Sequence, residues 1–452
     1  MFLRIIKALW GDLTRQEYKK FGILAAAMML IIGNYWMLRV TKDPLFELFV
    51  GFAKYQPVIK IISSFVILFL VLGYSKLVDL LKKQVLIYTL SAFYGFAFIS
   101  LSFLIANPNI ATISQTSIFY PLVSWIPGKG IGWFAYFLLE SYGSLLIALF
   151  YSFIASVMNA DLAKKGYGFM FALIQVSTVI GIFTEMYVVK TIGFSTVYFI
   201  GGILVLIAPF FIKLYLSVFK NEVTVTQDIK KSEQRKTGFF EGLRLIITHP
   251  YVLGILVVAS FYEIIHTILE YQMGCAALSV YTGQPHLFAV FKGYQGLATN
   301  ILSFSFAFFG GTSIFMRKFG LKFCLVSFPI SIGVVVLICA FSYLSGIGNQ
   351  YLMWILLGSC ATIRGLSYTL NKPTSEVMYI PTSKDIKFKA KSWIDMFGLR
   401  EAKSLGGAIN LIAPMFLFGS IISLGVVGVW VFVAAFVGNK FNQLQKDKQI
   451  IE

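Results

Sequence analysis

The chain has 452 residues, of which 58% are hydrophobic and only 13% are charged, and its mean hydropathy is +0.80. Soluble domains carry about 25% charged residues, so this composition excludes a water-soluble enzyme and predicts an all-α, polytopic membrane protein. The net charge of +18 does not indicate a nucleic acid polymer as partner, because the cytoplasmic loops of membrane proteins collect lysine and arginine.

The first segment, residues 1–20, predicts an interfacial amphipathic helix rather than a signal peptide. Arg4 and Lys7 interrupt its apolar positions, and no small-residue cleavage site follows. The motif TRQE, Thr14 to Glu17, has the form of a capping box. It indicates the start of a second short helix that leads into the first span.

Twelve apolar runs that are long enough to cross a hydrocarbon core follow in chain order. In the N-terminal half, residues 21–217, we expect spans near 21–38, 57–74, 86–105, 131–157, 168–188 and 194–216. A polar, basic linker, 218–249, separates this half from the C-terminal half, 250–440, and a tail, 441–452, follows. The spans of the second half are expected near 251–270, 293–315, 321–344, 350–370, 399–417 and 420–438.

The distribution of positive charge gives an independent check on this topology. If the N-terminus is cytoplasmic, most of the 38 lysines and arginines fall in inside segments and few in outside loops, as the positive-inside rule requires. We therefore expect both termini in the cytoplasm. Two six-helix halves joined by a long cytoplasmic linker are the layout of the major facilitator architecture, which binds substrate near the bilayer midplane.

Several ionisable residues lie inside the predicted spans, where charges are costly and usually functional. Glu263, His266 and Glu270 are spaced by three and four residues, so they lie on one face of the seventh span. This face is either a polar seam against a neighbouring helix or a lining of the translocation path that binds protons or cations. Glu140, in the fourth span, has the same two interpretations.

Three further charges lie within the predicted spans. Lys60 and Glu185 are nearer the ends of theirs, where a side chain that extends to the membrane interface is the simpler interpretation. Arg364 lies in the tenth span.

Motifs for catalysis or cofactor binding are absent from the sequence. It contains no phosphate-binding P-loop, and its three histidines and four cysteines show no metal-ligand spacing. No Ser-His-Asp arrangement is visible either. We therefore expect no enzyme, no catalytic residue, no metal and no cofactor.

The segment Asn371 to Gly407 is long, polar and basic. It is either a positively charged cytoplasmic loop that lies on anionic lipid or a source of cations for a polyanionic substrate. In the second interpretation Lys389, Arg400 and Lys403 are candidate ligands, and the helix start at KSLGG suits phosphate. The spacing alone leaves both interpretations open.

Four stretches resemble the nucleotide transporters, or ATP/ADP translocases, of obligate intracellular bacteria and plastids. They are LTRQEYKKFGILAAAMMLIIGNYWMLRVTKDPLF in the first span, LLESYGSLLIALFYSFI in the fourth, FYEIIHTILEYQ in the seventh, and the late block MYIPTSKDIKFKAKSWIDMFGLREAKSLGGA. The four stretches follow the order of the family pattern and extend along nearly the whole chain. The resemblance implies a multi-pass protein of a bacterial inner membrane that transports nucleotides.

The resemblance also implies substrate-binding residues. Lys42 matches the lysine of the family's K-D element, Glu140 the glutamate of the fourth span and Glu270 that of the seventh. Lys389 and Lys403 match lysines of the late block. Nucleotide phosphates bring several negative charges, which need several cations in a low-dielectric cavity. Asp43 is expected to position Lys42 rather than to touch the anion.

Departures from the family pattern leave two alternatives open. Ser156 stands near a usual asparagine, and Lys372 and Ser375 replace an aspartate and a lysine. We predict ATP/ADP exchange by a monomeric carrier in the lipid bilayer. The alternatives are proton-coupled uptake of a broader set of nucleotides, with Glu263, His266 and Glu270 as proton-coupling candidates, and a nucleotide-binding membrane protein that does not transport.

Overall fold

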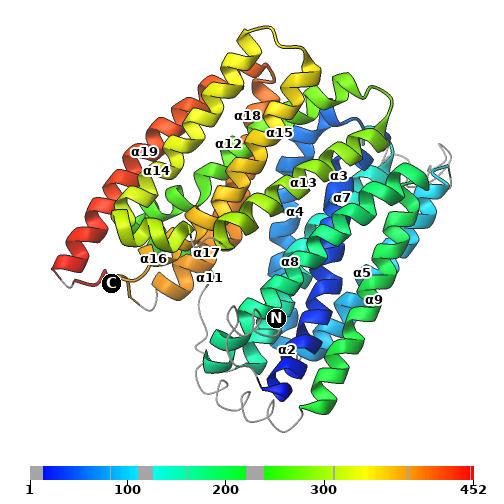
Figure 1. Ribbon diagram of the computed structural model, residues 1–452, viewed down its shortest axis with the longest axis horizontal. Helices are drawn as coiled ribbons and strands as arrows, with labels where there is room; N and C mark the ends of the chain where they lie inside the picture. Colours follow the sequence, from blue (N-terminus) through cyan, green and yellow to red (C-terminus); the bar gives the residue numbers. More distant parts are fainter. Residues whose placement is uncertain are drawn as a thin grey trace, which may run out of the picture. The chain divides into compact units, whose positions relative to one another are not determined.

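The structure is a computed structural model that describes residues 14–81, 83–109, 126–158, 160–219, 239–308, 311–383, 386–447 and 449–451. Its regular elements in these residues are all helices, labelled in Figure 1. The chain forms two compact units. Unit 1 comprises residues 1–51, 66–235 and 284–294, and unit 2 comprises 52–65, 236–283 and 295–452. Most of the predicted N-terminal segment and of the predicted linker lies outside the described residues.

Unit 1 begins with one uninterrupted helical stretch. It consists of α2 (Arg15–Met28), the π-helical turn η1 (Met29–Gly33) and α3 (Asn34–Phe49). Thr14 caps its start, and Glu17 returns the second hydrogen bond of the capping box. The sequence motif is therefore confirmed as a helix start, but the helix continues into the first span instead of ending before it.

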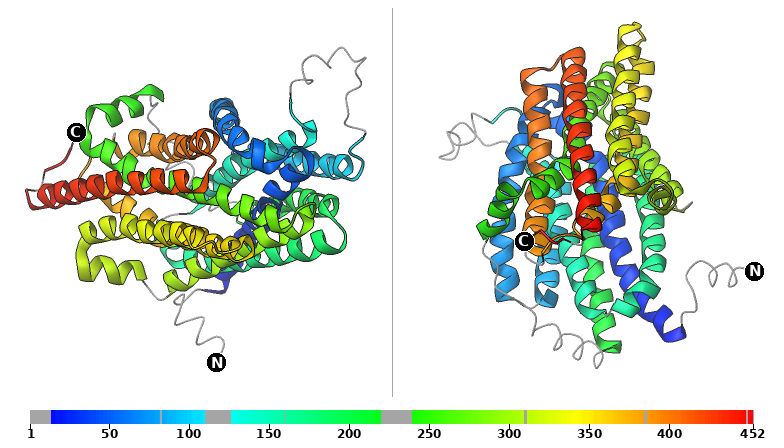
Figure 2. Two further views of the ribbon diagram at one scale, coloured as in Figure 1. Left: turned by 90° about the horizontal axis from the view of Figure 1, so that it is seen from above. Right: turned by 90° about the vertical axis from the view of Figure 1, so that its left-hand side faces the viewer.

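The other helices of unit 1 pack around this stretch. They are α5 (Lys83–Ala106), α7 (Gly130–Val157), α8 (Ala160–Thr191) and α9 (Phe194–Val218), with the later part of α4 (Phe52–Leu80) and the start of α13 (Pro285–Phe308). Helices α5 and α9 run side by side in Figures 1 and 2. A Cβ on Gly202 would lie 2.7 Å from the carbonyl oxygen of Gly95, so glycine lets these two backbones approach closely.

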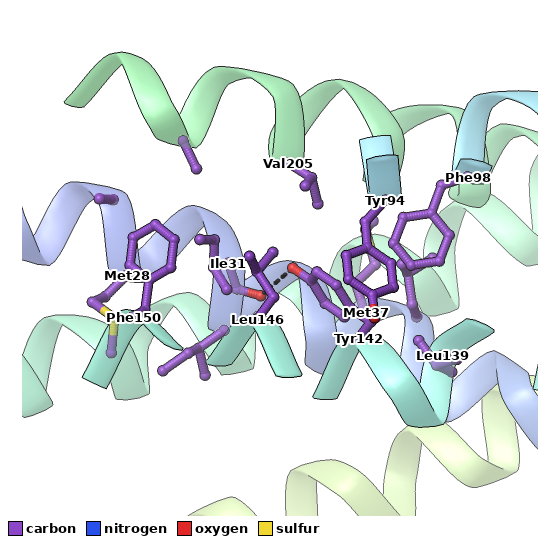
Figure 3. Close-up of a cluster of buried hydrophobic side chains, with 14 of the residues drawn as sticks. Met28, Ile31, Met37, Tyr94, Phe98, Leu139, Tyr142, Leu146, Phe150 and Val205 are labelled. Atoms are coloured by element: carbon purple, nitrogen blue, oxygen red, sulfur yellow. Dashed lines mark hydrogen bonds between the residues drawn. The ribbon is translucent and has the colours of Figure 1, made fainter. Parts of the chain in front are cut away.

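The core of unit 1 is rich in aromatic side chains. Tyr142 is fully buried in it, and the Tyr94 and Phe98 rings meet it edge-on at centroid distances of 5.3 Å each (Figure 3). Its hydroxyl donates a hydrogen bond of 2.9 Å to the carbonyl oxygen of Ile31. Since Ile31 lies in η1, the tyrosine satisfies a carbonyl at the π-helical turn, where the regular hydrogen-bond ladder changes.

Helix α8 packs directly on this turn. A Cβ on Gly181 would collide with the carbonyl oxygen of Gly33, and one on Gly33 would meet Ser177 at 2.9 Å. The two glycines therefore fix a close backbone approach between α8 and η1.

Unit 2 contains the first turns of α4 and the rest of α13. Its long helices are α12 (Pro250–Val280), α14 (Gly311–Leu344), α15 (Asn349–Leu366) and α19 (Phe416–Lys446). Helices α14 and α19 run side by side in Figures 1 and 2. Gly320 interrupts α14 with a φ of 79°, a conformation that favours glycine. The short helix α11 (Phe239–Thr248) precedes α12.

The late polar segment is largely helical. After α15 come the π-helical turn η2 (Ser367–Asn371) and α16 (Lys372–Met378). A second run consists of η3 (Ile386–Ala390), α17 (Lys391–Trp393), η4 (Ile394–Gly398) and α18 (Leu399–Ile412). This run begins at Ile386 and continues without a break into the predicted eleventh span. KSLGG therefore lies inside α18, and the expected helix start at KSLGG is wrong.

In the described part of the chain, nine helices are long and apolar enough to cross a membrane. They comprise residues 15–49, 52–74, 83–106, 130–157, 169–191, 194–218, 250–280, 316–344 and 416–446. The three other predicted spans overlap α13, α15 and α18 in part. Large apolar side chains such as Phe432, 77% exposed, and Phe341, 73% exposed, suit contact with lipid. The chain is a multi-pass membrane protein.

Candidate functional site

Two clusters of charged side chains lie inside the helical bundle, one in each unit. The Lys42 cluster of unit 1 consists of Arg39, Lys42, Asp43, Glu140 and Lys292. The Glu263 cluster of unit 2 consists of Lys60, Glu263, His266, Glu270, Arg364 and Lys403. Each cluster is described by its own contacts.

Two of the predicted site residues, Lys42 and Glu140, form an ion pair in unit 1. The Lys42 ammonium lies 2.5 Å from Glu140 Oε1 and 4.4 Å from the centroid of the Tyr136 ring. Lys42 comes from α3, and both partners come from α7, one turn apart. A carboxylate and an aromatic face thus compensate the charge of a lysine that is only 10% exposed.

Asp43 points to a different lysine. Its Oδ2 lies 3.0 Å from Lys292 Nζ in the first turns of α13, and both side chains are at most 5% exposed. This ion pair does not support the expectation that Asp43 positions Lys42, because Lys42 pairs with Glu140. Adjacent residues of α3 differ by about 100° in direction, so Lys42 and Asp43 reach different neighbouring helices.

Arg39 is a further, half-buried cation on the same helix, α3. Its guanidinium lies 4.8 Å from the Trp36 ring centroid and 5.8 Å from that of Tyr35. Because Arg39 precedes Lys42 by three residues, the two cations share one side of α3.

The predicted face of the seventh span is buried in unit 2. Glu263 Oε1 lies 2.7 Å from Arg364 Nη1 of α15 and accepts a hydrogen bond of 2.8 Å from the Tyr262 hydroxyl. Arg364 Nη2 lies 3.1 Å from His266 Nδ1. One arginine therefore joins two of the three predicted residues, which supports a structural polar network as well as a transport role.

The remaining members of the Glu263 cluster extend it to two other helices. Lys403 Nζ of α18 lies 3.8 Å from Glu263 Oε1, and Lys60 Nζ of α4 lies 3.5 Å from Glu270 Oε2. Lys60 pairs across the bundle and is only 9% exposed, so the prediction that it extends to the interface is wrong. Three cations here face two carboxylates, an excess that suits an anionic ligand.

Two late-block candidates, Lys389 and Arg400, make contacts with other residues of unit 2. Lys389 Nζ pairs with Glu241 Oε1 of α11 at 2.7 Å. The carbonyl oxygen of Arg400 accepts a hydrogen bond from Ser64 at 3.3 Å. Among the late-block cations, Lys403 contacts a carboxylate of the seventh span, that of Glu263.

Sequence reasoning missed two participants. The sequence places Arg364 inside a span without indicating its role, and it does not single out Lys292. A lone arginine in an apolar helix is itself a signal, since such a group requires a buried partner. Lys292 gave no comparable signal, because its partner Asp43 is far away in the sequence.

The fold is that of solved membrane transporters. The POT family transporter PepTSo matches with a TM-score of 0.62 at 12% identity, covering 94% of this chain and 98% of that one. The nucleoside transporter NupG matches with a TM-score of 0.54 at 13% identity, covering 94% and 99%. Apolar helices long enough to cross a membrane and this fold define the class of the chain as a multi-pass integral membrane protein with a transporter-like fold.

The family model described as TLC ATP/ADP transporter matches residues 1–441, and the chain belongs to this family. ADP,ATP carrier protein 1 of Rickettsia bellii is 25% identical, with 89% of this chain and 87% of the relative covered. ADP,ATP carrier protein 2, chloroplastic, of Arabidopsis thaliana is 24% identical, with 96% and 76% covered. The resemblance inferred from the four sequence stretches is confirmed.

Proposed function

We propose that the chain exchanges ATP for ADP across a membrane by alternating access. The observation that carries this function is the match of the ATP/ADP transporter family over residues 1–441. The ion pairs of the two clusters supply chemistry that suits such a substrate. They hold lysine and arginine inside a transmembrane bundle, where these side chains would otherwise be costly.

The substrate phosphates compete with carboxylates for these cations. Lys42 is held by Glu140, whose side chain is 29% exposed and is the more accessible partner. A phosphate offers more acceptor oxygens than a carboxylate and can take over the ammonium donors. Lys403, 36% exposed, acts in the same way in unit 2, with Arg400 and Lys389 as further phosphate ligands and Glu270 as the partner of Lys60.

Exchange requires that the loaded carrier reorients faster than the empty one. The Glu263 cluster holds three cations against two carboxylates, so without an anion it keeps an excess of one positive charge, which one negative charge of a bound phosphate chain neutralises. Moving a neutralised cluster through a low-dielectric region costs less than moving a charged one. This difference favours one-for-one exchange.

The same proposal includes the number of membrane spans, the orientation of the termini and the oligomeric state. The chain crosses a bacterial inner membrane twelve times, as two major-facilitator-like six-helix halves, residues 21–217 and 250–440. Both termini are cytoplasmic, and the carrier acts as a monomer. Helices at all twelve predicted positions support this count.

The test is nucleotide uptake by proteoliposomes that contain the purified protein. Labelled ATP should enter vesicles loaded with ADP at least tenfold faster than empty vesicles, because the empty carrier returns slowly. Lys42→Ala and Glu140→Ala should each lower this exchange, and Lys190→Ala, at an exposed lysine of α8, should leave it unchanged.

The alternatives give other results in the same vesicles. Uptake that ignores internal ADP refutes obligatory exchange and favours coupled uptake. Saturable nucleotide binding without any flux favours a binding protein that does not transport. If Lys42→Ala and Glu140→Ala exchange ATP like the unchanged protein, the site assignment in unit 1 is wrong.

A further inference from the structure

Glu185 is a buried carboxyl group in unit 1 that the nucleotide site does not use. It lies near the end of α8, and its exposed fraction is 0%. Neither of its carboxyl oxygens has a hydrogen-bond partner in the part of the chain that the structure describes. The expectation that this side chain extends to the membrane interface is therefore wrong.

Two other buried or half-buried acidic side chains of the same unit have a cationic partner. Asp43 has the Lys292 ammonium at 3.0 Å, and Glu140 has the Lys42 ammonium at 2.5 Å. An ionised carboxylate without such a partner is far too costly in a low-dielectric interior. Glu185 consequently carries a proton in this conformation.

The groups around Glu185 come from several elements that pack against α8. Helix α13 brings its backbone close, since a Cβ on Gly293 would lie 3.4 Å from Glu185 Oε2, and it also carries Lys292. Helix α3 contributes Lys42 and Asp43, each with the partner given above. Helix α9 contributes Tyr198, whose hydroxyl accepts a hydrogen bond of 3.4 Å from Thr41.

Helix α2 and the turn η1 also pack against α8. The turn η1, with the sequence MLIIG, has no titratable side chain. In α2, Lys20 is buried and lies 5.1 Å from the centroid of the Phe219 ring, while Tyr18 meets Phe169 of α8 edge-on. Phe169 precedes Glu185 by 16 residues, more than four helical turns, so neither group of α2 lies at the Glu185 end of α8.

We propose that Glu185 is a proton-binding site of the transport cycle, so that nucleotide movement is coupled to protons; this inference rests on the transport function proposed above. The proton is held on a carboxyl oxygen while Glu185 is enclosed. It passes to water when a conformational change exposes the carboxyl. Only the O–H bond forms and breaks, and no further reactant is needed.

The coupling operates through Lys292. When Glu185 loses its proton, a second carboxylate appears beside Gly293, next in sequence to Lys292. The new charge competes with Asp43 for the same ammonium, and an uncompensated carboxylate costs more in this interior than a shared one. Protonation of Glu185 therefore stabilises the Asp43–Lys292 pair and the contact between α3 and α13 that this pair makes.

The carboxylates predicted from the sequence fit a proton carrier less well. Glu263 has Arg364 and Lys403 beside it, and Glu270 has Lys60. Cationic partners stabilise the ionised form of a carboxylate, so these groups need no proton to remain buried. The surroundings of Glu263 and Glu270 suit ionised carboxylates, whereas those of Glu185 suit a neutral acid.

The experiment measures ATP uptake by ADP-loaded proteoliposomes under an imposed pH gradient, acidic outside. For the unchanged protein we expect uptake to rise severalfold over vesicles without a gradient. A pH-sensitive dye inside the vesicles should report acidification of their interior. Glu185→Gln keeps the shape of the neutral acid, so it should still exchange ATP for ADP but lose the response to the gradient. Glu47→Gln, on α3, is the matched control and should keep that response.

The other outcomes are decisive as well. A gradient response in Glu185→Gln equal to that of the unchanged protein overturns the proposal. ATP/ADP exchange in the unchanged protein without any gradient response also overturns it, yet leaves the proposed exchange function standing. Should Glu185→Gln not fold, Glu185→Asp retains a titratable carboxyl and must retain the response.

A second measurement does not depend on transport. Dicyclohexylcarbodiimide reacts with protonated carboxyl groups in apolar surroundings, and the adduct is located by mass spectrometry of peptides. Glu185 should be modified, faster in acidic than in alkaline buffer, while Glu263 and Glu270 should not. Absence of modification at Glu185 overturns the proton site, even if the protein moves no nucleotide and the proposed function fails.

Discussion

Replacing Arg364 with methionine tests whether the Glu263 cluster is held together by this one side chain. The variant removes the guanidinium that contacts Glu263 at 2.7 Å and His266 at 3.1 Å. It leaves Glu263, which is 2% exposed, with the Tyr262 hydroxyl and with Lys403 at 3.8 Å. The perturbation is thus the loss of the nearest cation from a buried carboxylate.

The magnitude follows from this geometry. Removing one partner of a buried ion pair costs about 3–5 kcal/mol. Since Lys403 and Tyr262 remain, we expect the lower limit, about 3 kcal/mol of the free energy of unfolding. Adding Glu263→Gln to Arg364→Met removes both charges, so the double variant should recover most of this loss.

Three buried cysteines allow an assay that reports unfolding within unit 2. Cys324, Cys339 and Cys360 are fully buried in α14 and α15 of unit 2, so a maleimide dye reports their exposure as detergent-solubilised protein is heated. At about 2–4 °C per kcal/mol, Arg364→Met should lower the midpoint by roughly 6–12 °C. Lys446→Met, at an exposed lysine of α19, should not shift it. Equal shifts in the single and double variants would refute the reasoning.

Two further predictions concern the packing on η1. Gly181→Ala places a Cβ against the Gly33 carbonyl oxygen and should cost about 1–3 kcal/mol, whereas Gly73→Ala, with open space around it, should cost nothing measurable; their midpoints of thermal unfolding decide this. Tyr142→Phe removes the hydrogen bond to the Ile31 carbonyl and should cost about 1–3 kcal/mol, and an unchanged midpoint would contradict the role of this bond.

Much of the fold follows from the sequence because the relevant signals are local. Apolar runs of sufficient length predicted helices, and the Thr14–Glu17 capping box marked a helix start to the residue. The spacing of Glu263 and His266 placed both on one helix face, where one arginine contacts them. These features depend on helical periodicity, which a sequence displays directly.

The sequence did not predict the partners of the buried charges. Lys60 finds Glu270, and Asp43 finds Lys292, across more than 200 residues of sequence. Periodicity tells which face of a helix a side chain occupies but not which helix it meets. For the same reason Glu185 was assigned to the membrane interface, although packing by α13 and α9 encloses it.

The π-helical turn η1 has a consequence for the orientation of everything that follows it in the first span. A π-helical turn accommodates one residue more than an α-helical turn. If the same residues wound as a regular α-helix instead, α3 would be rotated by about 100° relative to α2. Lys42 would then face away from Glu140, and Asp43 away from Lys292. One additional residue in a single turn, ahead of Lys42 and Asp43 in the chain, is therefore what directs both ion pairs.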